Sequence, residues 1–207
     1  MGKLYLCVEG VIGVGKTTLT LMISKRFGFH SALEIVEENP FLTNFYNDRE
    51  RWAFQTQLFF LLSRYSQQEE LLKIVKRENV IADYTFNKDK LFAKMNLSDD
   101  QFDLYERVHN VLNSKIAKPD LVVYLKASAG TIMDRIAMRD RVFERSINEE
   151  YISELIKAYD EFFSKYSEKF VVIDADENDF VRNKKDFNLI ISKIKKCGVE
   201  FDNWNMR

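Results

Sequence analysis

The sequence is short of cysteine, histidine, proline and glycine, and each shortage excludes a class of protein. The 207 residues include only two cysteines, Cys7 and Cys197, and two histidines. Two distant cysteines exclude a disulfide-built scaffold, and isolated histidines provide no Cys/His metal cluster. Two prolines and seven glycines are too few for a Pro/Gly-rich linker. The composition therefore favours a single domain over residues 1–207, in a reducing compartment such as the cytoplasm.

An excess of charge of one sign is lacking as well. Lys and Arg number 31 against 32 Asp and Glu, for a formal net charge of -1. A nearly neutral chain has no general attraction for nucleic acid or anionic lipid. No apolar run is long enough to cross a bilayer. We therefore expect a cytoplasmic protein whose partners include neither nucleic acid nor membrane.

Short apolar runs alternate with longer helical patterns along the chain. This alternation is typical of an α/β protein in which helices flank a parallel sheet. The helix expected over residues 49–76 has Leu58, Phe59 and Leu62 available for its apolar face. The five predicted strands cover residues 3–9, 32–36, 79–83, 121–125 and 170–174, and the predicted helices cover 16–26, 49–76, 99–117, 129–138, 148–166 and 184–196.

The strongest motif lies between the first predicted strand and the first predicted helix. It reads Gly10-Val11-Ile12-Gly13-Val14-Gly15-Lys16-Thr17 and matches G-x-x-x-x-G-K-[ST] at every fixed position. Its glycines let successive backbone N–H groups point at one anion, and the following helix adds its positive end. We expect Lys16 to reach the phosphates of ATP, Thr17 to bind Mg²⁺, and Thr18 to extend the nucleotide-binding set.

Two carboxylates are expected beside this phosphate loop. Glu34 is predicted at the end of the second strand and Asp83 at the end of the third. In an open parallel sheet, the C-terminal strand ends line the ligand crevice. A kinase needs one carboxylate to hold the acceptor hydroxyl, and the first candidate is Glu34. Glu37 and Glu38 compete for that role, while Asp83 joins Thr17 as a predicted metal ligand.

Three arginines predict a catalytic lid. Arg135 and Arg139 share a face of one predicted helix, and Arg141 lies at its end. Guanidinium groups match phosphate oxygens in two-point contacts, so a mobile segment carrying them can neutralise a transferring phosphoryl group. The competing interpretation is an ordinary helix end whose charge is balanced by Asp134, Asp140 and Glu144.

In this order and spacing, the motifs resemble the deoxynucleoside kinase family, especially its bacterial deoxyguanosine/deoxyadenosine kinase branch. The resemblance covers nearly the whole chain and rests on residues 9–17, 34–42, 45–46, 52–57, 63–65, 81–84, 135–144 and 174–187. It implies a P-loop kinase fold and ATP-dependent phosphorylation of the 5′-hydroxyl of a purine deoxynucleoside in nucleotide salvage. Deoxyguanosine is the first choice and deoxyadenosine the second. It also implies a homodimer formed by helix packing, for which the helix over 49–76 is suitable.

The same resemblance implies roles for individual residues. Glu34 acts as the base on the 5′-hydroxyl, and Tyr46 and Glu144 hold the 3′-hydroxyl. Gln57 and Arg64 contact the nucleobase and share a helix face because they are seven residues apart. Gln55 is the second candidate, after Gln57, for the glutamine that contacts the base. The aromatic candidates for stacking on the base are Phe41, Phe59 and Phe86.

The chain departs from the family pattern after the third strand. Many members carry an acid-Arg-Ser or acid-Arg-Thr triplet there, whereas this chain has Asp83-Tyr84-Thr85. The missing arginine leaves Lys88 as a candidate replacement. A second departure is Asp140, which stands where relatives often have glycine.

Two other functions stay open from the sequence. A nucleoside monophosphate kinase of thymidylate-kinase type would need arginines such as Arg49 and Arg64 to face an acceptor phosphate. A nucleotide-dependent switch would bind ATP or GTP without an acceptor. The GTP version is disfavoured because Asn87-Lys88-Asp89-Lys90 places its aspartate one position too early for an Asn-Lys-x-Asp guanine reader.

Overall fold

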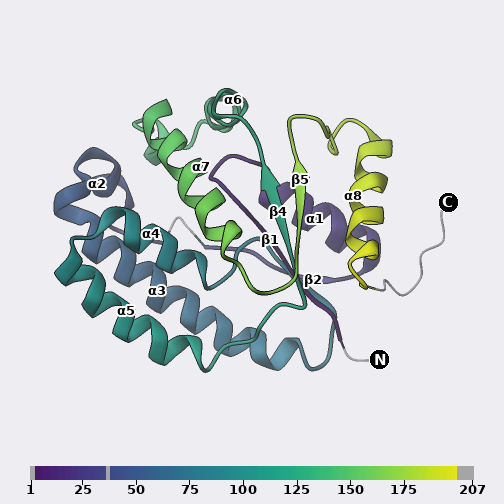
Figure 1. Ribbon diagram of the computed structural model, residues 1–207, viewed down its shortest axis with the longest axis horizontal. Helices are drawn as coiled ribbons and strands as arrows, with labels where there is room; N and C mark the ends of the chain where they lie inside the picture. Colours follow the sequence, from purple (N-terminus) through teal and green to yellow (C-terminus); the bar gives the residue numbers. More distant parts are fainter. Residues whose placement is uncertain (1–2, 36–37, 200–207) are drawn as a thin grey trace.

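A computed structural model describes residues 3–35 and 38–199. Within these residues, five strands form one parallel sheet in the order β2-β3-β1-β4-β5 (Figure 1). The predicted α/β class and five-stranded parallel sheet are therefore confirmed. The strands are β1 (Tyr5–Gly10), β2 (His30–Ala32), β3 (Val80–Ala82), β4 (Leu121–Lys126) and β5 (Phe170–Asp174).

Helices connect the strands, and two of them were missed from the sequence. The missed helices, α2 (Leu42–Asn47) and α4 (Lys88–Asn96), are six and nine residues long, too short to give a clear helical pattern of apolar residues. Among the helices that the structure describes, none combines the length and apolar character of a bilayer span. The helices are α1 (Lys16–Phe27), α2 (Leu42–Asn47), α3 (Arg49–Ile74), α4 (Lys88–Asn96), α5 (Asp99–Asn113), α6 (Ala129–Arg139), α7 (Glu149–Ser164) and α8 (Lys184–Lys196), with a 3-10 turn, η1, at Val142–Glu144.

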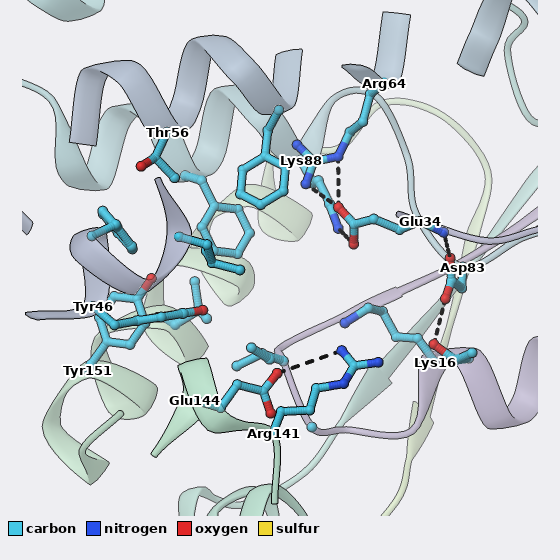
Figure 2. A pocket seen from close by; sticks show the side chains of 18 of the residues that line it. Lys16, Glu34, Tyr46, Thr56, Arg64, Asp83, Lys88, Arg141, Glu144 and Tyr151 are labelled. Atoms are coloured by element: carbon cyan, nitrogen blue, oxygen red, sulfur yellow. Dashed lines mark hydrogen bonds and ion pairs between the residues drawn. The ribbon is translucent and has the colours of Figure 1, made fainter. Parts of the chain in front are cut away.

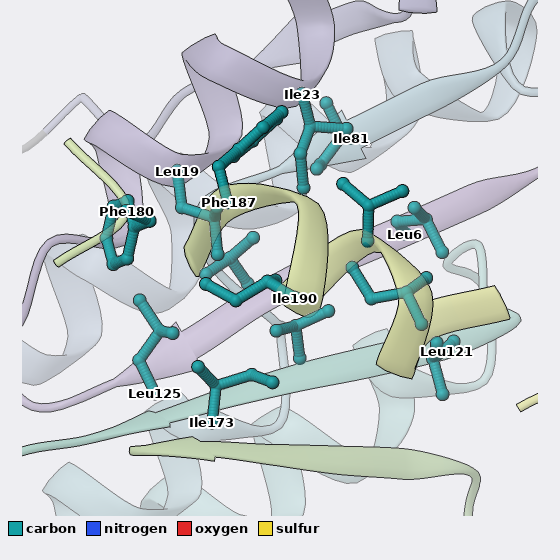
Figure 3. Packing of buried hydrophobic residues seen from close by; sticks show 14 of the residues in the cluster. Leu6, Leu19, Ile23, Ile81, Leu121, Leu125, Ile173, Phe180, Phe187 and Ile190 are labelled. Atoms are coloured by element: carbon teal, nitrogen blue, oxygen red, sulfur yellow. The ribbon is translucent and has the colours of Figure 1, made fainter. Parts of the chain in front are cut away.

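The sheet is covered on both faces, with α1 and α8 on one side and α3, α4, α5 and α7 on the other (Figure 1). Successive side chains of a strand point to opposite faces, so Leu6 of β1 packs toward α1 and α8 while Cys7 packs toward α7. Figure 3 shows Ile23 of α1 and Ile190 of α8 meeting the strands in the first of these clusters. Burial on both faces holds β1, which carries the phosphate loop, in the centre of the core.

The second strand is shorter and earlier than predicted. The sequence predicted residues 32–36, but β2 covers His30–Ala32 and pairs only with β3. The ladder stops because β3 ends at Ala82, and the next side chain, Asp83, accepts the Glu34 N–H at 2.7 Å. Glu34 therefore lies in the loop after β2 rather than at the strand end.

The buried face of α3 also differs from the predicted one. Leu62, expected on the apolar face, is 55% exposed. The buried stripe instead contains four polar side chains, Thr56, Gln57, Arg64 and Gln68, beside apolar ones such as Phe60 and Leu61. Apolar periodicity misjudged the orientation of this helix because much of its buried face is polar.

Candidate active site

The phosphate loop requires its glycines. Gly10 has φ 145°, and a Cβ there would lie 2.4 Å from the Leu125 carbonyl oxygen. Gly13 has φ 83°, and its Cβ would lie 2.9 Å from a side-chain carbon of Ile136 on α6. Directly after the loop, α1 begins at Lys16. The loop therefore presents backbone N–H groups and a helix N-terminus, which fits the anionic phosphates of a nucleotide.

Lys16 extends back over this loop. Its ammonium group donates to the carbonyls of Gly10 at 2.9 Å and Val11 at 3.1 Å. Burial, together with the nearby Lys88 ammonium, lowers the pKa of Lys16 to about 8. Phosphates bind the charged form of this side chain, so their binding raises its pKa.

This pKa predicts a pH-dependent affinity for ATP. Above pH 8 most free protein carries a neutral Lys16, so binding must take up a proton. The Kd for ATP should then rise with pH, by up to about tenfold per pH unit. Lys16→Arg should flatten this dependence because guanidinium stays charged. Calorimetric titrations across this range measure both, and a pH-independent Kd in the parent protein contradicts the prediction.

Two cavities meet at the phosphate loop. The first has a volume of about 320 Å³ and is lined by Glu34, Tyr46 and Glu144, among others (Figure 2). The second, of about 760 Å³, lies along the loop, α6 and residues 175–182. Both linings contain Gly13, Lys16, Thr17, Arg139 and Arg141. This arrangement provides one space for a phosphate donor and a separate space for a small acceptor.

Glu34 lies at the centre of a buried charge network in the first cavity (Figure 2). Its Oε1 accepts hydrogen bonds from Arg64, at 2.8 Å from Nε and at closer range from Nη2, and its Oε2 accepts from Lys88 Nζ at 2.6 Å. Arg64 also pairs with Asp89, which is fully buried. Burial alone would raise the pKa of Glu34, but Arg64 and Lys88 outweigh it and hold the pKa well below its usual value. Glu34 is therefore anionic at neutral pH.

Neither Asp89 nor its pairing with Arg64 was anticipated from the sequence. The available signal was a Lys-Asp pair shortly after the third strand, at the carboxyl edge of the sheet. Lys88, a candidate only through the missing arginine, contacts Glu34 directly. Glu37, the competing candidate for the base, lies outside the described residues.

Asp83 joins the acceptor side of the site to the phosphate loop. Its Oδ1 accepts the Glu34 N–H, and its Oδ2 accepts the Thr17 hydroxyl at 2.5 Å. Within residues 3–35 and 38–199, no group of three or more His, Cys, Asp or Glu side chains could hold a metal alone. Mg²⁺, however, commonly takes only one or two protein oxygens and completes its shell with phosphates and water. The oxygens of Thr17 and Asp83 fit that requirement.

Tyr46 and Glu144 lie together at the other end of the first cavity (Figure 2). Glu144 is 1% exposed and accepts hydrogen bonds from Arg139 at 3.1 Å from Nε and 2.6 Å from Nη2. Burial and the neighbouring Tyr151 raise the pKa of Tyr46, so its hydroxyl keeps its proton. The pair offers one hydrogen-bond donor and one acceptor side by side.

One face of α3 forms the wall beside them. Gln57, Phe60 and Arg64 line the cavity, and the Arg64 guanidinium lies 4.6 Å from the centroid of the Phe60 ring. Gln55, the second choice for base contact, is exposed and absent from this lining. Phe60 shares the helix face of Gln57 and Arg64 because it is spaced three and four residues from them.

The expected aromatic residues lie elsewhere. Phe41 stacks on Trp52 with centroids 5.9 Å apart, and Phe86 stacks on His109 at 5.0 Å. Phe59 packs edge-on against Phe41. The phenylalanines that line the first cavity are Phe45, Phe60 and Phe92.

The three arginines of the predicted lid occupy different places. Arg135 donates to the carbonyls of Val14 at 2.7 Å and Ala175 at 3.1 Å, which ties the phosphate loop to the end of β5. Arg139 ends α6, and Arg141 follows Asp140, whose φ of 48° is left-handed. Aspartate tolerates this conformation better than most residues, which explains how it stands where relatives often have glycine. A catalytic lid stays a prediction.

A phosphate loop, a parallel sheet and a carboxylate in an adjoining cavity together define a P-loop phosphotransferase. Residues 6–198 match the family model described as deoxynucleoside kinase. The chain belongs to the deoxynucleoside kinase family, and it is an enzyme of that class.

Individual relatives agree with this assignment. The chain is 39% identical to a deoxyguanosine kinase of Bacillus subtilis over 202 residues, covering 94% of this chain and 98% of the relative. It is 32% identical to a deoxyadenosine kinase of Dictyostelium discoideum over 86% of this chain and 74% of the relative. A solved deoxyadenosine kinase from M. mycoides, with the products dCMP and dCDP bound, superposes with a TM-score of 0.82 at 32% identity, covering 93% of this chain and all of that one.

Proposed function

We propose that the protein transfers the γ-phosphoryl group of ATP to the 5′-hydroxyl of a purine deoxynucleoside, with deoxyguanosine preferred over deoxyadenosine. The observation that carries the proposal is the position of Glu34, whose carboxylate lines a cavity that meets the phosphate loop at Lys16 and Thr17. An acceptor oxygen held by Glu34 there faces the end of a triphosphate bound in the loop. Positioning and charge compensation are the main requirements of this reaction.

On the donor side, the phosphates bind residues 10–18, with Lys16 as the principal cation. Thr17 and Asp83 hold Mg²⁺, which neutralises phosphate charge when it is bound. Arg139 and Arg141 border both cavities and act as the lid over the transferring group, and Arg135 supports the loop beneath it.

On the acceptor side, Glu34 orients the 5′-hydroxyl and receives its proton late in the transfer. A strongly acidic carboxylate is a weak base, so orientation is its main contribution before the new bond forms. The Tyr46 hydroxyl and the Glu144 carboxylate hold the 3′-hydroxyl. Gln57 offers both a donor and an acceptor to the edge of a base, with Arg64 beside it.

The proposed preference for purine deoxynucleosides is supported by the names of the relatives. The Bacillus relative is a deoxyguanosine kinase and the Dictyostelium relative a deoxyadenosine kinase, so both act on purine deoxynucleosides by name. A role in nucleotide salvage in the cytoplasm completes the proposal. The free cysteines Cys7 and Cys197 suit a reducing compartment.

A substrate panel tests the proposed function. Mg-ATP is supplied with each of the four deoxynucleosides, with dGMP and with dTMP, and ADP release is measured together with chromatography of the products. We expect dGMP from deoxyguanosine as the fastest reaction and dAMP from deoxyadenosine as the second. Absence of turnover with every nucleoside overturns the proposal. Turnover only with monophosphates favours the thymidylate-kinase alternative. The two arginines that this alternative needs for an acceptor phosphate already have carboxylate partners. Arg64 pairs with Glu34 and Asp89, and Arg49 Nη1 lies 3.7 Å from Glu154 Oε2.

We also propose a homodimer. A groove of about 500 Å³ between α4 and α7 is lined by apolar Leu91, Met95 and Phe162 and bordered by side chains of both charges, including Lys94 and Glu161. Two copies of such a groove can pack against each other with complementary charges. We expect a dimer mass by light scattering for the parent and a monomer for Met95→Glu. The sequence instead favoured dimer packing through the helix over residues 49–76, and a monomer for Leu62→Glu on α3 together with a dimer for Met95→Glu would support that interface. A monomeric parent contradicts the proposal.

A further inference from the structure

Lys88 is a buried cation placed directly on the proposed base. It opens α4 and its side chain is 5% exposed, with Nζ 2.6 Å from Glu34 Oε2. The other oxygen, Oε1, already receives Arg64. Arg64 is in turn balanced by the buried carboxylate of Asp89. The four charges therefore form two neutral pairs, Arg64 with Asp89 and Lys88 with Glu34. Protonation of Glu34 would leave the Lys88 ammonium without a neutralising partner.

Lys88 also shares a cavity with a second ammonium group. Both Lys16 and Lys88 line the first cavity, and Figure 2 shows the Lys16 nitrogen directed into the space beside the Glu34 carboxylate, which Lys88 reaches from another side. The charge on Lys88 helps to lower the pKa of Lys16. Two like charges that face one space are stabilised when an anion enters between them. In the proposed reaction, that anion is the transferring phosphoryl group.

We propose that Lys88 is a catalytic residue that contacts the transferring phosphoryl group from the acceptor side, opposite Lys16 on the donor side. This inference rests on the proposed function. In the transfer, the 5′-oxygen forms a bond to the γ-phosphorus while the bond from that phosphorus to the β,γ-bridging oxygen breaks. The hydroxyl proton passes to Glu34, ADP leaves, and Lys88 stays protonated. Lys88 thus loses its anionic partner as a phosphorylated product forms beside it, and its charge becomes available to phosphoryl oxygens.

A purely neutralising role for Lys88 makes a different prediction. If Lys88 served only to offset Glu34, its loss would weaken the network and raise the pKa of Glu34. The acid limb of the pH profile would then shift upward, and full rate would return at higher pH. In contrast, loss of a cation that contacts the phosphoryl group slows transfer at every pH, because negative charge develops on that group in each turnover.

The test compares Lys88→Met and Lys88→Arg with Lys196→Met. Lys196 is exposed at the end of α8 and lines neither the donor cavity, nor the acceptor cavity, nor the groove between α4 and α7. Single-turnover transfer rates are measured from pH 6 to 9 with deoxyguanosine and Mg-ATP. Equilibrium Kd values for deoxyguanosine are measured separately without donor. Thermal unfolding checks that each variant folds.

We expect Lys88→Met to slow transfer by about a hundredfold at every pH. This is the usual effect of removing one preorganised group that stabilises charge in a transition state. The Kd for deoxyguanosine should change by only a few fold, Lys88→Arg should keep much of the rate, and Lys196→Met should match the parent. Transfer by Lys88→Met within threefold of the parent, or restored at high pH, overturns this inference and leaves the proposed function intact. A parent protein inactive on every nucleoside overturns both.

Discussion

Replacing Glu34 by Gln should reduce turnover by about a thousandfold while the Kd for ATP stays close to that of the parent. The amide cannot accept the hydroxyl proton, and it cannot carry the negative charge that Arg64 and Lys88 surround. Donor binding should persist because the phosphate loop is built from residues 10–18. Steady-state kinetics and calorimetric titration with ATP measure the two quantities separately.

Two matched variants make the test of Glu34 specific. Glu38 is exposed and lies four residues further along, so Glu38→Gln serves as the control and should match the parent. Glu37→Gln tests the competing candidate and should also keep its activity. Loss of turnover in Glu37→Gln with normal turnover in Glu34→Gln would reverse the assignment of the base. Thermal unfolding should accompany each assay, because Glu34→Gln leaves the buried Lys88 ammonium without a carboxylate and removes one of the two carboxylates that Arg64 contacts.

The change Asp83→Asn should be nearly as damaging, with turnover lowered by several hundredfold. Both oxygens of Asp83 accept hydrogen bonds, one from the Glu34 N–H and one from the Thr17 hydroxyl. An asparagine can keep the Glu34 N–H contact only by turning its NH₂ group toward Thr17, whose hydroxyl must then rotate to accept a hydrogen bond and loses its present orientation. The proposed metal site also loses a charge. We therefore expect both a lower maximal rate and a higher Mg²⁺ concentration at half-maximal rate.

Asp120 provides the control for this change. Its carboxylate accepts the Tyr5 N–H at 2.8 Å, which is the same type of contact at the start of β1 rather than beyond the ends of the strands. Asp120→Asn should affect stability slightly and leave the Mg²⁺ dependence unchanged. Equal effects of the two variants on the Mg²⁺ dependence would show that Asp83 has no special connection with the metal.

Features encoded by neighbouring residues could be predicted from the sequence. The phosphate loop depends on glycines and a following helix within one short stretch, and β4 and β5 are continuous apolar runs. The position of Asp83 after β3 follows from the same local reasoning. Local hydrophobicity and turn chemistry therefore sufficed for β1, β3, β4 and β5 and for the phosphate loop.

The acceptor side could be predicted only in part, because its contacts join distant residues. Arg64 and Glu34 are 30 positions apart and Lys88 and Glu34 are 54 apart, so no local pattern reveals their pairing. The length of β2 depends on where its neighbour β3 stops. The orientation of α3 was misjudged because polar Gln57, Arg64 and Gln68 face inward. The partners of Arg64 are Glu34 and Asp89, and both lie outside the helix.

The shared lining of the two cavities has a stereochemical consequence. The residues common to both are Gly13, Lys16, Thr17, Arg139 and Arg141, and none of these is a histidine, cysteine or carboxylate able to carry a phosphoryl group. The Thr17 hydroxyl donates to Asp83, the proposed metal ligand, and the Lys16 ammonium donates to backbone carbonyls, so neither is placed as a nucleophile. A donor and an acceptor that fill the two spaces therefore meet without an intervening protein nucleophile. For the proposed reaction, this geometry implies a single displacement, in which a chiral γ-phosphorus emerges with inverted configuration.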